Sequence, residues 1–328
     1  MKKFAFLLLV LISFSTYAQI EKEIVGKAMT DEDKKKLTDT LEGWKIGETG
    51  GINFNQAGFV NWAAGGTPAV SLLFNGRVYA DYKRGKHLMQ NWFAAEYGIQ
   101  FLKNDDKNWE LSKSADRWEL FSKYGYQISK KWYASTYVDL RSQFAPTKVP
   151  SVVDANQDSV VSKMGSPMTL EWAVGFDYVP NQYFSLFLSP LATKFVFVAD
   201  DAIAMTNTYG NIYPEKVKKE LGAVLIATYN QTFIDRINLS SIFKAYKDYL
   251  NPKPGKNIDI DWQTTIGLKV TSWLSANIFT QLVWDYDTKF TEDDGTITEK
   301  VQFRDVIGVN LGYTANWYKA KDQKAIKF

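Results

Sequence analysis

Apolar and polar residues alternate in many short segments of this chain, most clearly over residues 258–270. One set of alternating positions is apolar apart from a threonine: Ile258, Ile260, Trp262, Thr264, Ile266, Leu268 and Val270. The positions between them hold polar residues and a glycine. Because successive side chains of a strand point to opposite faces, this spacing predicts a β-strand with one apolar and one polar face.

The same alternation predicts twelve strands, each long enough to cross a bilayer at a tilt, which takes about 9 to 11 residues. The predicted ranges are 44–55, 69–82, 88–103, 115–128, 132–144, 167–180, 183–198, 219–232, 236–248, 257–271, 275–289 and 299–318. The alternation is weakest at 219–232 and 236–248, so the faces of those two strands stay unassigned.

The predicted connections alternate in length. Long or polar links fall at 56–68, 104–114, 145–166, 199–218, 249–256 and 290–298, and short links fall near 83–87, 129–131, 181–182, 233–235 and 272–274. Bacterial outer-membrane barrels have short periplasmic turns, longer outside loops and an even strand count, whereas a soluble β-sandwich has no reason to sort its loops in this way. We therefore predict an all-β protein, a transmembrane antiparallel β-barrel of twelve strands, surrounded by lipid in the outer membrane of a Gram-negative bacterium.

The two ends of the chain differ from the barrel. Residues 1–18 have the charged start, short apolar run and small residues of a secretory signal peptide, and that run is too short to span a bilayer as a helix. Residues 19–43 are polar and helix-prone, which predicts a periplasmic N-terminal arm. The barrel is then expected over 44–318, followed by a basic C-terminal tail at 319–328.

Composition narrows the classes of function. The chain has a formal net charge of only +3, which argues against nucleic acid as a partner. It has no cysteine, which excludes disulfides, thiolate metal sites and a lipoprotein anchor. Aromatic residues make up 15% of the chain, a content that suits the interfacial girdles of membrane barrels. Nothing in the sequence predicts a cofactor.

Three segments stand out as motifs: NWAAGG at 61–66, SPLATKFVFVADD at 189–201, and DIDWQTTIGLKVTSWLSANIFTQLVWDYD at 259–287. Together they resemble a family of Bacteroidota proteins of unknown function. The resemblance implies an outer-membrane β-barrel, in agreement with the alternation. It implies no activity and no catalytic or binding residues.

Charged residues of both signs fall on the predicted inner faces. They are Glu96, Arg117, Glu119, Asp139, Arg141, Glu171, Asp177, Asp259, Asp261 and Arg304. One interpretation is a set of salt bridges that closes a narrow lumen, and the other is a selectivity constriction for a small polar solute. The inward aromatics Trp92, Tyr133 and Tyr137 either pack the lumen or stack against a sugar or nucleoside.

Two predicted outside loops carry further candidates. Trp62, Gly65 and Gly66 lie in an apolar segment that we expect to fold into the barrel mouth as a plug. In the loop 145–166, Asp154, Asn156 and Asp158 match the first three ligand positions of a calcium loop. Ser159 and Gly165 replace the glycine and glutamate expected later in that motif, so we expect a polar turn and no metal.

The sequence favours a narrow channel or passive transporter for a small solute. The alternative is a closed barrel that serves as a structural or accessory subunit of a larger envelope complex, with other envelope proteins as partners. Catalysis is not expected, because a serine–histidine site needs a base beside the nucleophile and the single histidine, His87, falls at a predicted periplasmic turn. A carboxylate-based hydrolase stays open.

Overall fold

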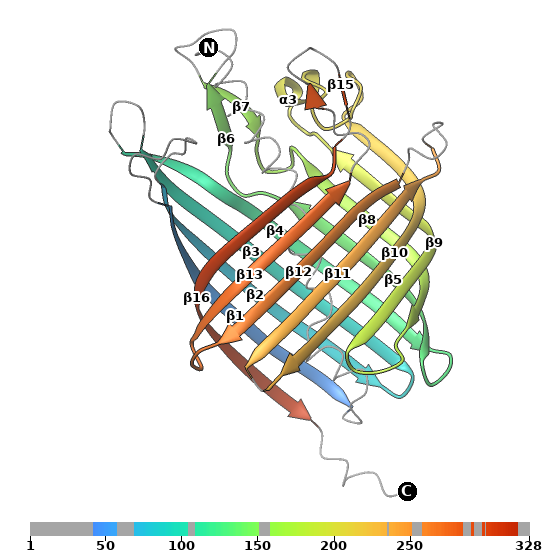
Figure 1. Cartoon of the computed structure of the whole chain (residues 1–328). Coiled ribbons are helices and arrows are strands. Elements are labelled where there is room, and N and C mark those ends of the chain that lie inside the picture. The colour runs from blue at the N-terminus through green and yellow to red at the C-terminus, as the bar shows by residue number, and fades with distance from the viewer. Residues whose placement is uncertain are drawn as a thin grey trace, which may run out of the picture.

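The twelve predicted strands form and close into one antiparallel barrel (Figure 1). The computed structural model describes residues 42–57, 69–103, 109–150, 158–234, 236–250, 258–284, 290–291, 297–298 and 300–320. Around the wall the strands are β1 (Gly43–Ala57), β2 (Ala69–Arg84), β3 (His87–Lys103), β4 (Trp109–Gln127), β5 (Trp132–Ser142), β8 (Met168–Tyr178), β9 (Phe184–Phe197), β10 (Val217–Phe233), β11 (Ile237–Asp248), β12 (Ile258–Lys269), β13 (Leu274–Trp284) and β16 (Gln302–Ala320).

The barrel closes between its first and last strands. β1 pairs with β16 from Gly43 opposite Ala320 to Phe54 opposite Val309, and it pairs with β2 on its other side. Closure gives each of the twelve barrel strands a neighbour on both sides, which a lipid environment requires because it offers the backbone no hydrogen-bond partners. The prediction of a closed twelve-stranded barrel is therefore confirmed.

The two faces of the wall have opposite character. Along β8, for example, Trp172, Val174 and Phe176 are exposed on the outside while the alternate positions are buried. The outward Trp172 Nε1 donates to Thr136 Oγ1 over 3.0 Å, so its N–H needs no partner from lipid. An apolar exterior around a polar interior is the architecture of bacterial outer-membrane proteins, and it places this chain in that membrane.

Short and long connections lie at opposite ends of the barrel. Short turns join β2 to β3, β4 to β5, β8 to β9, β10 to β11 and β12 to β13. The opposite end carries a hairpin of β6 (Thr147–Pro150) and β7 (Asp158–Ser162), the helix α3 (Asp201–Met205), and the short pair β14 (Phe290–Thr291) and β15 (Ile297–Thr298). By the rule for such barrels the short turns are periplasmic. No helix in the described part of the chain is long and apolar enough to cross a membrane.

The connection between β3 and β4 is shorter than predicted. β4 begins at Trp109, whereas the alternation predicts a strand only from residue 115. The register shifts between Gly98, which is opposite Ala115, and Ile99, which is opposite Lys113, so Ser114 is an extra residue in β4. A bulge adds one residue to a strand and breaks its alternation, so the sequence pattern hid the first part of β4.

The outer end is organised by the segment around α3. Asp200 caps this helix by accepting a hydrogen bond from Ile203 N over 3.0 Å, and its carboxylate pairs with Lys163 beside β7. Val198, Ile203 and Ala204 form a small buried cluster beneath the helix. These contacts join the two outer loops that follow β5 and β9 into one folded unit.

Candidate functional site: the two walls of the lumen

An aromatic layer fills part of the lumen. Trp92 of β3 and Phe121 of β4 are opposite each other, and their rings stack with centroids 3.7 Å apart. The Tyr137 ring lies 5.6 Å from Phe121, and the Phe187 ring lies 5.4 Å from Tyr137. All four side chains are buried. Trp92 and Tyr137 thus contribute to one continuous layer that includes Phe187 of β9.

Ion pairs lie next to the aromatic layer. Arg117 Nη2 is 3.1 Å from Glu119 Oε2 on β4, and both side chains are almost fully buried. Asp139 and Arg141 make the equivalent pair on β5. Residues two apart on a strand share a face, so each pair forms within a single strand. Each charge then has a partner that offsets part of the cost of leaving water.

One ion pair crosses several strands. Lys244 of β11 reaches both carboxylate oxygens of Glu171 on β8, over 2.8 and 2.9 Å. Tyr137 donates its hydroxyl hydrogen bond to Glu171 Oε1 over 2.5 Å. The three side chains join β5, β8 and β11 across the lumen, in front of the intervening β9 and β10.

Sequence reasoning missed Lys244. The alternation of β11 is weak because polar residues also occupy outward positions such as Ser241. Ser241 accepts a hydrogen bond from Trp262 Nε1 over 2.9 Å, and this partner makes a polar residue tolerable on the lipid face. The polar residues at every second position, Lys244 and Asp248 among them, were the signal that could have assigned the inner face.

Two other predicted carboxylates have hydrogen-bond or ion-pair partners inside the lumen. Asp261 of β12 accepts hydrogen bonds from Gln263 Nε2 over 3.0 Å and from Gln281 Nε2 over 2.9 Å. Asp177 of β8 is paired with Lys123 Nζ over 2.6 Å.

The remaining charged residues that the sequence assigns to the lumen also occupy inward positions of their strands. Glu96 is buried and is opposite Arg117 in the pairing of β3 with β4. Asp259 is half-buried and is opposite Tyr246. The backbone of Arg304 pairs with Gln281, and its side chain lies outside the described set.

The opposite part of the lumen has a different lining, which we call the small-residue wall. Ten inward positions spread over β12, β13, β16 and β1 hold short, uncharged side chains or none, next to longer or charged ones such as Asp261 and Gln281: Gly267, Ser275, Asn277, Gly308, Asn310, Gly312, Gly47, Thr49, Gly51 and Asn53. Thr49 is opposite the inward Arg77 of β2, whose guanidinium lies 4.3 Å from the Trp92 ring. Thr49 is nevertheless exposed, so solvent reaches the lumen beside this wall.

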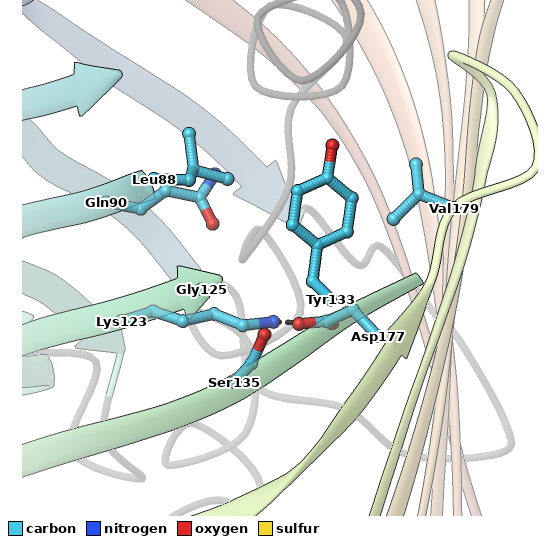
Figure 2. A pocket seen from close by; sticks show the side chains of 8 residues that line it. All are labelled: Leu88, Gln90, Lys123, Gly125, Tyr133, Ser135, Asp177 and Val179. Atoms are coloured by element: carbon cyan, nitrogen blue, oxygen red, sulfur yellow. Dashed lines mark hydrogen bonds and ion pairs between the residues drawn. The ribbon is translucent and has the colours of Figure 1, made fainter. Parts of the chain in front are cut away.

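A small pocket lies at the short-turn end of the lumen, and Tyr133 lines it (Figure 2). The Lys123–Asp177 pair lies beside the ring, and Leu88 and Val179 pack with it. The pocket encloses about 260 Å³ of empty space, part of which is open to solvent. It lies between the aromatic layer and the short turns.

Most of the candidate residues in the outer loops lie outside the part of the chain that the structure describes. Trp62, Gly65 and Gly66 are outside the described residues, as are Asp154 and Asn156. Asp158 begins β7, where its backbone pairs with that of Pro150. In the residues that the structure describes, no three histidine, cysteine, aspartate or glutamate side chains are grouped closely enough to hold a metal ion.

Comparison with known families supports one expectation from the sequence. The family model described as a protein of unknown function, DUF3078, matches residues 54–147. This confirms the expected likeness to an uncharacterised family. The match includes the NWAAGG segment, whereas the other two segments and the expected bacterial phylum stay predictions. No curated protein matches the sequence.

Solved membrane barrels resemble the fold at low identity. The translocator domain of autotransporter NalP from Neisseria meningitidis has 12% identity and a TM-score of 0.41, with 92% of this chain and 97% of that chain covered. An outer-membrane channel from Pseudomonas putida F1 has 10% identity and a TM-score of 0.42, with 85% and 97% covered. The toluene transporter TodX from P. putida has 10% identity and a TM-score of 0.33, with 86% and 91% covered. The fold assignment rests on the strand pairing of this chain itself.

Proposed function

We propose that this barrel is a narrow outer-membrane channel for a small polar solute. The observation that carries the proposal is the exposure of Thr49, an inward residue of β1 that is paired with the inward Arg77 of β2. Interior side chains just fill an eight-stranded barrel, and twelve strands enclose more room. Short side chains on the small-residue wall leave part of that room free.

The lining of this path favours an uncharged solute. Thr49 and Asn53 are polar and carry no charge, while the buried ion pairs of the lumen are already neutralised by their partners. A polar solute could exchange hydrogen bonds with water for bonds to the wall, whereas an ion would lose more hydration than the wall returns. The channel is therefore expected to pass small neutral solutes better than ions.

A closed, structural barrel is the second candidate. It is favoured by the aromatic and charged side chains that fill part of the lumen. The aromatic layer and the Lys244–Glu171 pair occupy the lumen between β3 and β11. If side chains also meet across the remaining space, the barrel has no continuous path. It would then act in the envelope through partner proteins.

A catalytic role has less support. The ring of His87 lies at the start of β3, where Nδ1 is 2.7 Å from the Tyr124 hydroxyl and the ring contacts Tyr126. These contacts are on the outward face, away from the lumenal hydroxyls. The single histidine is therefore not placed to activate a nucleophile inside the barrel.

The channel and the closed structural barrel can be distinguished with purified full-length protein. In liposomes, a channel should give swelling with small neutral polyols and low, discrete conductance steps in planar bilayers. Correctly folded protein, identified by its heat-modifiable migration on gels, that shows neither swelling nor conductance would contradict the channel. Partner proteins recovered with such a silent barrel in mild detergent would support the structural candidate.

A further inference from the structure

Two neighbouring periplasmic turns carry four cations. Arg84 and Lys86 flank Gly85 in the turn between β2 and β3, and Lys130 and Lys131 lie in the turn between β4 and β5. Gln127 N donates a hydrogen bond to Lys86 O over 2.8 Å, which joins the two turns. All four side chains are exposed. We call these four residues the basic cluster.

The basic cluster lies beside the lipid-facing surface. Arg84 is opposite His87, and His87 is opposite Tyr126, so the three share the outward face. The His87 and Tyr126 rings meet edge to face at 5.2 Å, and Lys86 Nζ lies 6.0 Å from the Tyr126 ring. Outward aromatic rings mark the level where the hydrocarbon meets the headgroups. The cations therefore lie at the depth of lipid phosphates.

The cluster has an excess of positive charge. Among the described residues, none of its four cations has a carboxylate within ion-pair distance. The nearby Glu42 accepts a hydrogen bond from Gly85 N over 2.7 Å and offsets one of the four charges. At the outer end, by contrast, Lys163 pairs with Asp200 and Lys216 pairs with Asp201.

We propose that the basic cluster binds an anionic phospholipid of the periplasmic leaflet. Arg84 and Lys86 hold the phosphate by charge-assisted hydrogen bonds, with Lys130 and Lys131 beside them. The acyl chains lie along the outward rings of Tyr126 and Trp132. A soluble phosphate would use only the cations, whereas a lipid also uses the aromatic surface directly above them. This combination favours the lipid over a free anion.

The test uses purified full-length protein in mixed micelles of phosphatidylglycerol and phosphatidylcholine, with bound lipid identified by native mass spectrometry. The wild type should retain phosphatidylglycerol in preference. The double variant Arg84→Gln/Lys86→Gln should lose about thirtyfold of that preference, since each cation near an anionic surface contributes about 1 kcal/mol. The matched control, Lys148→Gln/Lys219→Gln, removes two exposed cations at the outer end and should keep the preference. Heat-modifiable migration on gels confirms that each variant is folded.

Three results would overturn the proposal. The first is equal retention of the two lipids by the wild type. The second is displacement of phosphatidylglycerol by excess inorganic phosphate, which would assign the cluster to a free anion. The third is recovery of an acidic protein that depends on Arg84 and Lys86 without any lipid preference. Weaker retention of phosphatidylglycerol by a Tyr126→Ser variant would support a lipid, because a free anion makes no use of that ring.

Discussion

Lys244 and Glu171 are 73 residues apart in the chain, yet the Lys244 ammonium lies within 2.9 Å of both Glu171 carboxylate oxygens. The pair bridges β8 and β11 across the inner surface of the barrel. It ties two parts of the wall together and occupies lumen space in the same contact. Stability and permeability should therefore both depend on it.

Replacing Lys244 with methionine should destabilise the barrel and raise its conductance. Among the described residues, the Tyr137 hydroxyl would be left as the hydrogen-bond partner of Glu171, and removing one member of a buried pair costs about 3–5 kcal/mol. Urea titration of folding in lipid vesicles and planar-bilayer recording measure the two effects. The double variant Lys244→Met/Glu171→Gln should recover much of the stability, because no unpaired charge stays buried. Equal stability of the single and double variants would refute the proposed coupling.

Filling the small-residue wall should block the proposed path. A phenylalanine at Thr49 places a large ring inside the lumen at a position that solvent reaches. Most of the conductance and liposome swelling should be lost. The control is Val78→Phe on the neighbouring strand, which adds a ring to the outside, where Val78 is 51% exposed. Equal permeation by both variants would mean that solute does not pass beside Thr49.

An arginine at Val138 should test the lipid-facing assignment of β5. Val138 is 41% exposed on the outside of the wall between the inward Tyr137 and Asp139. A cation near the bilayer midplane destabilises a barrel by about 2–4 kcal/mol, whereas one near the interface costs about 0–1 kcal/mol. Ser129→Arg, in the adjoining turn, is the control and should have little effect. Reversible urea unfolding in vesicles measures both, and similar values would contradict the assignment.

The outer unit around α3 should loosen only in acid. Hydrogen bonding from Lys163 and from Ile203 N lowers the pKa of Asp200 below its ordinary value of 3.8. A carboxyl whose folded pKa is depressed stabilises the fold above its unfolded pKa, and this contribution is lost as pH falls through the folded pKa. The hydrogen-exchange protection factors of residues 199–216 should therefore stay constant from neutral pH to about pH 5 and fall below the ordinary pKa.

Two substitutions separate the roles of Asp200. Asn is as good a helix cap as Asp, so Asp200→Asn should keep most of the protection while losing the ion pair with Lys163. Asp200→Ala should lose both the helix cap and the ion pair, so that residues 199–216 are exposed to exchange even at neutral pH. If the alanine variant exchanged as slowly as the wild type, the cap would not organise this unit.

The sequence determined the strands and their faces because both follow from a local rule. Side chains alternate across any strand, and one face of this barrel meets lipid, so residues such as Trp172 and Glu171 reveal their positions without knowledge of the fold. The rule failed in β4, where a bulge shifts the alternation before Asp116. It also failed at the outward Ser241, which is polar and accepts a hydrogen bond from Trp262.

Only the tertiary structure decided which inward residues meet. Closure, tilt and register bring Lys244 to Glu171 across two intervening strands, and no spacing in the sequence encodes that distance. The same three-dimensional geometry gathered the aromatic rings on one wall and left the glycines and asparagines on the other. Alternation specifies the face of a side chain, whereas the partner across a lumen depends on how the whole sheet curves and closes.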